Sequence, residues 1–244
     1  MNKLKVELIS HTPNPEKLVA AAAKLCYSNA EIADLMDGLT ADNTEKFIER
    51  LASLGHQSPM EHISFTFGIE GVSRALLAQI TRHRLASFSV QSQRYCNMKQ
   101  NGYVTPDAIY GNPQLRELYE STMEKLWGVY EYLADKLKMG YIVNGIDEKT
   151  AEKMAIEDAR YVLPNGCETK MMVTMNAREL LHFFRMRCCN RAQSEIQDLA
   201  DLMLHEVKQV CPVLFAKAGA ACVSGPCSEG PMTCGHPRKV VIGE

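Results

Sequence analysis

The amino-acid sequence predicts a mixed α/β protein, in which a sheet is flanked by long helices. Residues 63–69 alternate apolar and polar side chains, which is the period of a half-buried strand. Residues 112–138 instead form a long run that opens with Asn112-Pro113, a cap followed by the proline of a first helical turn. Strand and helix patterns of this kind recur along the chain and together predict the fold class.

The same signals place the other elements. Further strands are expected at residues 3–9 and 167–175, and further helices at 14–27, 42–54, 72–84, 147–159, 176–187 and 191–210. Asn14 and Pro15 are expected to cap and open the first helix, and Gly55 and Gly140 to end two others. The polar run that follows residue 84 has little helical periodicity and is interpreted as a shaped loop.

Length and composition favour one soluble domain. A chain of 244 residues with 46% hydrophobic and 23% charged residues can bury one substantial core. We expect a single catalytic domain at residues 1–220 and a Cys/Gly/Pro-rich tail at 221–244. The sequence has no apolar run of about 20 residues and no apolar region behind its N-terminal lysines, so a cytoplasmic protein without membrane contact is expected.

Nine cysteines, an odd number, suit reduced thiols better than a disulfide framework. Two groups of potential metal ligands are nevertheless present. His56, Glu61 and His62 precede the strand at 63–69 without a further obvious ligand, and the tail contains Cys222, Cys227, Cys234 and His236. Because the tail spacings match no common zinc finger, we predict no metal site.

The most informative stretch is residues 71–106, which contain no aspartate or glutamate. Its positive side chains are Arg74, Arg82, His83, Arg84, Arg94 and Lys99. In a chain of net charge −2, this local potential suits a small anion, and the interspersed serines and glutamines add neutral hydrogen-bonding groups that could read a base. A solvated helix face is the alternative interpretation of such an arginine-rich segment.

The segment also carries a motif. Residues 82–94 match R-H-R-x-x-S-x-x-x-x-S-x-R at every fixed position, and the chain therefore resembles the flavin-dependent thymidylate synthases. Further similarity to that family lies in a His-x-Ser-Pro-x-Glu-His segment at 56–62 and in Ala-Arg-x-Val-Leu-Pro, Asn-x-Arg, Phe-x-x-x-Arg and Ala-Gln-x-Glu-Ile further along the chain. The resemblance spans roughly residues 56–200.

This resemblance implies an activity and a fold. It implies a methyltransferase that converts dUMP to dTMP with 5,10-methylenetetrahydrofolate as the one-carbon source, NADPH as the reductant and FAD as the flavin. It also implies the mixed α/β fold of that family, with FAD held between the subunits of a homotetramer. The absence of G-x-G-x-x-G agrees with a flavin site that is not of the Rossmann type.

Residue roles follow from the same resemblance. Arg187 is expected to be catalytic, by stabilising negative charge on the uracil ring. Residues expected to contact dUMP are Gln79, Arg82, Ser92, Gln93, Arg94, Arg160 and Arg187. Residues expected to border FAD are Ser58, Arg82, His83, Arg84, Asn176, Arg178 and His182. Val90 departs from the acid that many relatives carry at this position, so contacts at Val90 and Gln91 are in doubt.

Other chemistries are conceivable for some of these residues. His83 is interpreted as a flavin or folate contact rather than an acid or base, and Ser87 and Ser92 as ligand-holding groups, since an activated serine needs an adjacent base. Cys96, Cys188 and Cys189 lie outside any recognised nucleophile motif. A non-catalytic nucleotide- or RNA-binding regulator is the alternative function, although the weak aromatic content of the basic segment disfavours single-strand binding.

Overall fold

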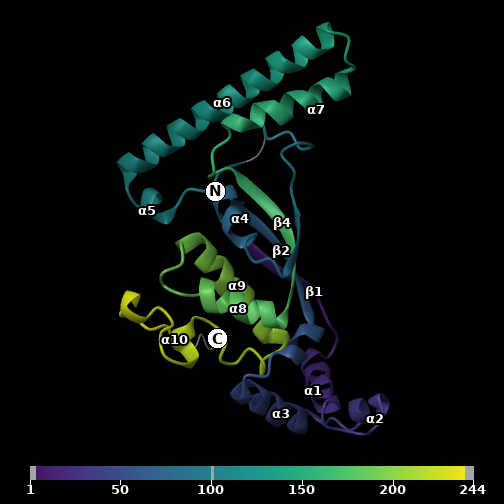
Figure 1. Cartoon of the computed structure of the whole chain (residues 1–244). Helices are drawn as coiled ribbons and strands as arrows, with labels where there is room; N and C mark the ends of the chain where they lie inside the picture. The colour runs from purple at the N-terminus through teal and green to yellow at the C-terminus, as the bar shows by residue number, and fades with distance from the viewer. Residues whose placement is uncertain (1–3, 100–101, 240–244) are drawn as a thin grey trace. The chain divides into compact units, whose positions relative to one another are not determined.

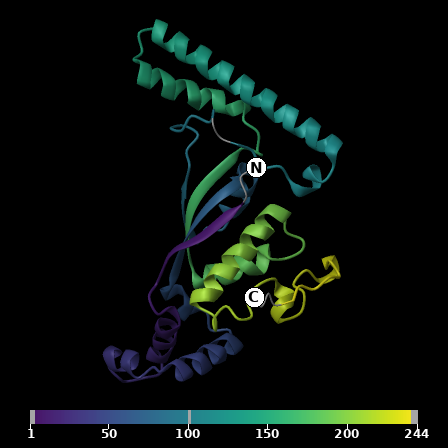
Figure 2. The ribbon, with the colours of Figure 1, turned by 180° about the vertical axis from the view of Figure 1, so that it is seen from behind.

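The computed structural model describes residues 4–99 and 102–239 and contains a four-stranded antiparallel sheet in the order β1-β2-β4-β3 (Figures 1 and 2). The strands are β1 (Lys5–His11), β2 (Ser64–Ser73), β3 (Ala86–Val90) and β4 (Glu168–Asn176). The prediction of a mixed α/β fold is confirmed. The chain divides into two compact units, which are described separately; β2, β3 and β4 contribute residues to both.

Unit 1 contains Glu70–Gln79 and Ser89–Met171. Its helices are α5 (Asp107–Tyr110), α6 (Pro113–Val143), α7 (Glu148–Ala159), the short η2 (Arg160–Val162) and most of α4 (Arg74–Ile80). The long helices α6 and α7 lie side by side in Figures 1 and 2. Ion pairs from Lys138 to Glu148 (3.0 Å) and Glu152 (3.1 Å) join them.

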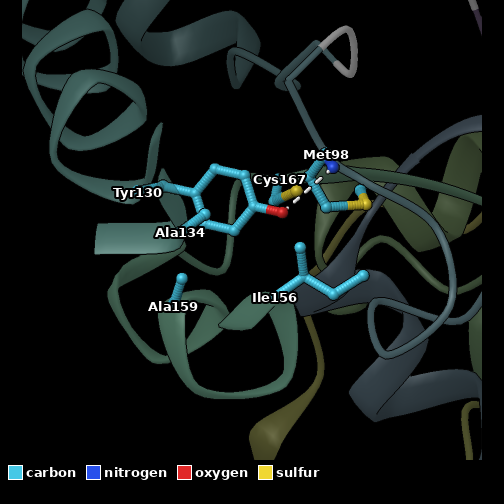
Figure 3. Close-up of a cluster of buried hydrophobic side chains, with 6 residues drawn as sticks. All are labelled: Met98, Tyr130, Ala134, Ile156, Ala159 and Cys167. Carbon is cyan, nitrogen blue, oxygen red and sulfur yellow. Dashed lines mark hydrogen bonds between the residues drawn. The ribbon is translucent and has the colours of Figure 1, made fainter. Parts of the chain in front are cut away.

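A buried cluster forms the core between these two helices and the chain segments beside them (Figure 3). Its centre is Tyr130, which is fully buried and whose hydroxyl oxygen accepts the backbone N–H of Met98 at 3.2 Å. Trp127 packs against the same cluster and donates to the Met98 carbonyl at 3.1 Å. These hydrogen bonds satisfy polar groups that burial would otherwise leave unpaired, so they stabilise the packing of Tyr130 and Trp127 against the segment at Met98. Through Tyr130 and Trp127, α6, the helix expected over 112–138, packs against the core of this unit.

Unit 2 contains Lys5–Ile69, Ile80–Phe88 and the chain from Met172 onward. Its helical segments are α1 (Pro15–Leu25), α2 (Ile32–Asp37), α3 (Ala41–Leu54), η1 (Ser58–His62), α8 (Ala177–Arg187), α9 (Ser194–Val210), α10 (Ala221–Ser224) and η3 (Gly230–Met232). The inward side chains of β2 pack with aromatic residues of later segments: Phe65 lies 5.7 Å from Phe215, and Phe184 lies 6.0 Å from Phe215, between ring centroids. Burial of these rings stabilises the core of the unit.

Local capping signals explain where three helices begin. The side chains of Asn112, Asp147 and Asn176 accept backbone N–H groups of the first turns of α6, α7 and α8. Each satisfies a donor that the helix itself leaves unpaired. Pro15 also opens α1 as predicted, but Asn14 makes no side-chain cap: its backbone is left-handed, with φ 47°, a conformation that asparagine tolerates.

Several predicted boundaries were wrong. The helix expected at 72–84 covers only α4, because β2 continues through Ser73, whose hydroxyl caps the helix by accepting the N–H of Leu76 at 3.0 Å. Helix α4 ends at Ile80, whose carbonyl accepts the N–H of His83 in a turn. Arg82 and His83 therefore lie on a turn and not on the helix expected over 72–84.

Other corrections have similar causes. The loop expected after residue 84 contains β3, whose Phe88 and Val90 alternate with exposed serines. The helix expected to stop at Gly140 continues to Val143, since α7 packs along this part of α6 and Tyr141 donates to Asp158 at 3.1 Å. Helix α9 begins at Ser194 rather than near residue 191, and α2 and α5 were not predicted.

The C-terminal tail, described to residue 239, packs against the segment that follows α8. Arg238 forms a two-pronged ion pair with Asp201 at 2.8 and 3.1 Å and also donates to the Cys188 carbonyl at 2.7 Å. Arg191 pairs with Glu229 at 3.1 Å. These contacts hold the tail against Cys188 and Arg191, which follow Arg187 in the chain, and against Asp201 of α9. Within the described residues, no helix combines the length and apolar character that crossing a membrane requires.

Candidate active site

The predicted site residues fall in both units, and the two groups are considered one at a time. Unit 1 contains Gln79, Ser92, Gln93, Arg94 and Arg160, which were expected to bind dUMP. Unit 2 contains Ser58, Arg82, His83, Arg84, Asn176, Arg178, His182 and Arg187, which were expected to border FAD or act on the uracil.

His83 is the centre of the group in unit 2. It is 7% exposed, and its Nδ1 lies 2.9 Å from Oε1 of Glu179, which is also buried. Its other nitrogen, Nε2, accepts a hydrogen bond from Nε of Arg187 at 3.2 Å. The turn after α4 and the two ends of α8 are thus joined through one imidazole ring.

The charges around His83 favour its neutral form. Burial lowers the pKa of His83, the carboxylate of Glu179 opposes this, and the nearby Arg187 and His182 lower the pKa further. Burial and the nearby Arg82 likewise lower the pKa of the Arg187 guanidinium, which remains charged. The guanidinium groups of Arg82 and Arg187 therefore form a local positive environment beside the neutral ring of His83.

The N-terminal end of α8 places another group of predicted residues. Asn176 is occupied as the helix cap, and its side chain accepts the backbone N–H of Glu179 at 2.9 Å. Arg178, in the first turn, forms an ion pair with Glu61 of η1. Ser58 lies at the start of the same η1 and is exposed, as are His182 on α8 and Arg84 on the turn after α4. These side chains are accessible to a ligand.

In unit 1 two of the predicted residues, Arg94 and Arg160, contact Glu157 of α7. Arg94 forms an ion pair with the Glu157 carboxylate, and Nε of Arg160 donates to the Glu157 carbonyl at 3.2 Å. Ser92 supports this arrangement, since its hydroxyl accepts the backbone N–H of Arg94 at 3.1 Å. Two guanidinium groups are therefore each held by a contact to the same residue, one to its carboxylate and one to its backbone carbonyl. Gln79 lies on α4 of the same unit.

Arg74 adds a third guanidinium, for which the sequence patterns predicted no role. Its Nη2 donates to the Gln91 carbonyl at 2.7 Å, and its Nε is buried with no hydrogen-bond partner among the described residues. Burial lowers the pKa of Arg74, and the nearby Arg160 adds to this, whereas Cys167 opposes it. Gln93 reaches the same cysteine, with Nε2 lying 3.6 Å from Sγ. The backbone of Gln91 is thus a structural contact.

One group of potential metal ligands occurs among residues 4–99 and 102–239, namely His83, Glu179 and His182, with ligating atoms within 4.8 Å of one another. Both nitrogens of His83 are already hydrogen-bonded, and the guanidinium groups of Arg82 and Arg187 disfavour a further cation. The group is better explained as a hydrogen-bond network. The potential ligands of the tail and of residues 56–62 form no such group in the described part of the chain.

The comparisons with known proteins bear on this arrangement. A family model described as thymidylate synthase complementing protein matches residues 7–213. The flavin-dependent thymidylate synthase of Clostridium tetani is 52% identical over 232 residues, covering 95% of this chain and 93% of the relative. The chain belongs to the flavin-dependent thymidylate synthase family. Two other flavin-dependent thymidylate synthases are also similar along nearly their whole length. The one from Geobacter sulfurreducens is 47% identical over 239 residues, covering 97% of this chain and 96% of the relative. The one from Pyrococcus horikoshii is 36% identical over 235 residues, covering 93% of this chain and 90% of the relative.

Membership of the flavin-dependent thymidylate synthase family confirms the predicted resemblance. All the site residues named above lie within the matched residues 7–213, and the contacts of the tail lie partly beyond them. The relatives carry the name of an enzyme, and the match to them covers nearly the whole of each chain. The alternative of a non-catalytic nucleotide- or RNA-binding regulator therefore has no support.

Two residues that contact or lie beside the predicted site residues had not been singled out as candidates from the sequence, namely Arg74 and Glu179. Arg74 belongs to the acid-free segment, and its position directly after the β2 strand pattern was the available signal. Glu179 gave a weaker signal: an acid in the first turn of a helix is ordinary, and nothing local indicates that it lies against His83, 96 positions away in the chain. Only the tertiary structure identifies its role.

Proposed function

We propose that this chain catalyses the reductive methylation of dUMP to dTMP, with 5,10-methylenetetrahydrofolate as methylene donor, NADPH as reductant and FAD as the flavin. The observation that carries the proposal is the complete signature at residues 82–94 in a chain that matches enzymes of this name along 95% of its length. Cytoplasmic location and a homotetramer with shared active sites are part of the proposal.

Arg187 has the central chemical role in this proposal. Carbon 5 of uracil is a weak nucleophile, and its electron density rises when N3 loses its proton. A guanidinium beside that ring stabilises the developing anion more than the neutral ring, and such a difference accelerates a reaction. The hydrogen bond from Arg187 to His83 supports this role, because it fixes the guanidinium before substrate arrives.

The unit 1 group is proposed to hold the phosphate and base of dUMP. Arg94 and Arg160 supply charge, and Ser92, Gln79 and Gln93 supply neutral hydrogen-bonding groups. The Arg94 guanidinium is paired with the Glu157 carboxylate, which is itself an anion. A phosphate with more charge and three acceptor oxygens would compete for the same donors. Arg82 and Arg187 are likewise proposed to contact dUMP.

The donor set in unit 2 fits a flavin dinucleotide. Arg82, Arg84 and Arg178 are exposed guanidinium groups that suit a diphosphate, and the exposed Ser58 and His182 offer polar side chains to the ring system. Asn176 and His83, whose side chains are already hydrogen-bonded within the protein, are proposed to border the flavin. FAD bound there would accept reducing equivalents from NADPH and supply them for the reduction of the transferred methylene. The protein residues bind and orient the group; none of them is proposed to form a covalent bond with the uracil.

Flavin binding tests the proposal directly. The purified chain is incubated with FAD, desalted, and its visible absorption spectrum recorded before and after addition of dUMP. We expect a retained flavin spectrum that shifts with dUMP, and dTMP formation when methylenetetrahydrofolate and NADPH follow. A colourless protein after desalting would contradict the proposal. A flavin-bearing species that sediments as a 27.3 kDa monomer would contradict only the shared-site assembly.

A further inference from the structure

Glu179 is a buried acid for which the proposed reaction has so far no use. It is 6% exposed and lies in the first turn of α8, where its backbone N–H is bound by the Asn176 side chain at 2.9 Å. Its carboxylate points to Nδ1 of His83 at 2.9 Å. Burying a carboxylate is costly unless it is paired and hydrogen-bonded, so this contact is a constrained feature of the fold.

The hydrogen bonds fix the protonation of His83. Nε of arginine is always a donor, so Nε2 of His83, which receives it, must present a lone pair. The proton of the neutral ring therefore resides on Nδ1, where the Glu179 carboxylate accepts it. The opposite tautomer would set an N–H of His83 against the N–H of Arg187 and leave Nδ1 facing a carboxylate without a proton between them.

The surroundings of His83 act in the same direction. The groups that face it are Arg187 and His182 of α8, both unfavourable to its protonation, and Glu179, which favours it. The Phe183 ring also packs edge-on at 5.0 Å between centroids and excludes water from one side. A doubly protonated His83 would lose its bond to Arg187, so the network requires the neutral ring.

We infer that Glu179 is a positioning residue: it fixes the Nδ1–H tautomer of His83, whose Nε2 then holds Arg187 by its Nε. Within the described residues Arg187 is held in this way at Nε alone, which leaves the two terminal nitrogens of its guanidinium to face an anionic ring. The inference rests on the proposed function only in the role given to Arg187; the arrangement of the three side chains is independent of it.

The tautomer of His83 is the first measurement, made on the flavin-loaded protein without substrate. The ¹⁵N chemical shifts of His83 are expected to show a protonated Nδ1 and an unprotonated Nε2. In Glu179→Gln, whose amide can donate as well as accept, the Nε2–H form should become populated. An Nε2–H form in the unmodified protein would overturn the inference even if every activity assay supported the proposed function.

Kinetics provide the second measurement. Glu179→Gln is expected to lower kcat roughly 10- to 100-fold, with a smaller change in KM for dUMP and unchanged flavin content, as when a partner that orients a histidine is lost. In a His83→Gln background the glutamine oxygen can accept from Arg187 without help from Glu179, so adding Glu179→Gln should cause little further loss. Equal losses in both backgrounds, or a kcat within twofold of the unmodified enzyme, would overturn the inference.

The two proposals fail in different ways. If Arg187→Ala kept near-normal turnover, the chemical role of Arg187 would be wrong while the tautomer measurement still stood. If Arg187→Ala lost turnover but Glu179→Gln did not, the proposed function would stand and the positioning role would be wrong.

Discussion

Nε of Arg187 donates a hydrogen bond to Nε2 of His83 across 3.2 Å, although the two residues are 104 positions apart in the chain. The contact joins the C-terminal turn of α8 to the turn that follows α4. It brings the last arginine of the Phe-x-x-x-Arg pattern against the histidine of the R-H-R motif. Two sequence patterns that lie far apart along the chain therefore belong to one network.

Removal of the Arg187 side chain should affect chemistry more than cofactor binding. Arg187→Ala is expected to lower turnover at least about 100-fold, the scale seen when a group that stabilises a developing anion is lost, while FAD remains bound. Initial rates and the flavin absorption of the desalted protein provide the two readings. Arg185→Ala, an exposed arginine in the last turn of the same helix, is the matched control and should be near normal. Near-normal turnover in Arg187→Ala would contradict the catalytic role proposed for Arg187.

The stability of the protein should depend on pH through His83. The pKa of His83 in the folded chain is lowered from 6.5 by burial, and less by Arg187 and His182, so below about pH 6.5 the unfolded chain binds more protons than the folded chain. This contribution to the free energy of unfolding is complete above pH 6.5 and is lost as pH falls through the lower folded pKa. Urea titrations at several pH values should show the decline, and His83→Gln should reduce it. An unchanged pH profile in His83→Gln would contradict the assignment to this residue.

Arg94 is expected to act in dUMP binding and not in folding. Arg94→Ala should raise KM for dUMP roughly tenfold, as one charge-assisted contact is lost, with little change in melting temperature because its ion pair with Glu157 is exposed. Lys99→Ala removes a comparable exposed pair, with Asp135, and serves as the control. Steady-state kinetics in dUMP distinguish the two variants. If both raised KM equally, the effect would be one of general charge.

The tail should contribute to stability through Arg238. Arg238→Ala removes the two-pronged pair with Asp201 and the bond to the Cys188 carbonyl, and we expect a loss of about 1–3 kcal/mol in the free energy of unfolding. Lys239→Ala, at the exposed neighbouring position, should change it little. Equilibrium denaturation of the two variants makes the comparison. Equal stability of both would mean that the tail contacts do not stabilise the unit.

Two glycines of unit 1 should respond to alanine in opposite ways. A Cβ at Gly166 would clash with the Tyr119 hydroxyl and lie 2.9 Å from Cε of Met123, so Gly166→Ala is expected to cost about 1–3 kcal/mol. Gly128 lies within α6, where an added Cβ would meet nothing within 4 Å, so Gly128→Ala should stabilise by about 0.5–1 kcal/mol through helix propensity. Denaturation curves of both variants test the packing beside α6, and a destabilised Gly128→Ala would contradict it.

Local signals explain what could be predicted. The caps Asp147 and Asn176 mark the starts of α7 and α8, and the alternation at 63–69 marks β2, because each pattern acts over a few residues. The limits of α4 were wrong since Ser73 can serve equally as the last residue of a strand and as a helix cap, and composition does not distinguish these uses.

The site shows the same division. The signature arginines could be assigned to ligands because the motif is long and specific. The partners that hold them could not be assigned: Glu179, Glu157 and Arg74 reach their contacts through tertiary packing, and none stands at a distinctive spacing from the residue it touches. The assignment of the signature residues to ligands therefore stays a prediction, and sequence patterns gave no signal for the contacts that these partner side chains make in the structure.

The strand order has a consequence for how the chain is made. In the order β1-β2-β4-β3, β4 is the neighbour of both β2 and β3, yet it is the last strand to be synthesised. About 100 residues separate the end of β2 from that of β4, which at roughly 5–20 residues per second is a wait of about 5–20 s. During that interval the nascent chain carries Phe65, Phe67 and Ile69 with the β4 edge of their strand unpaired. The ribosome-bound chain therefore exposes an unpaired strand edge, which favours aggregation until β4 has been made.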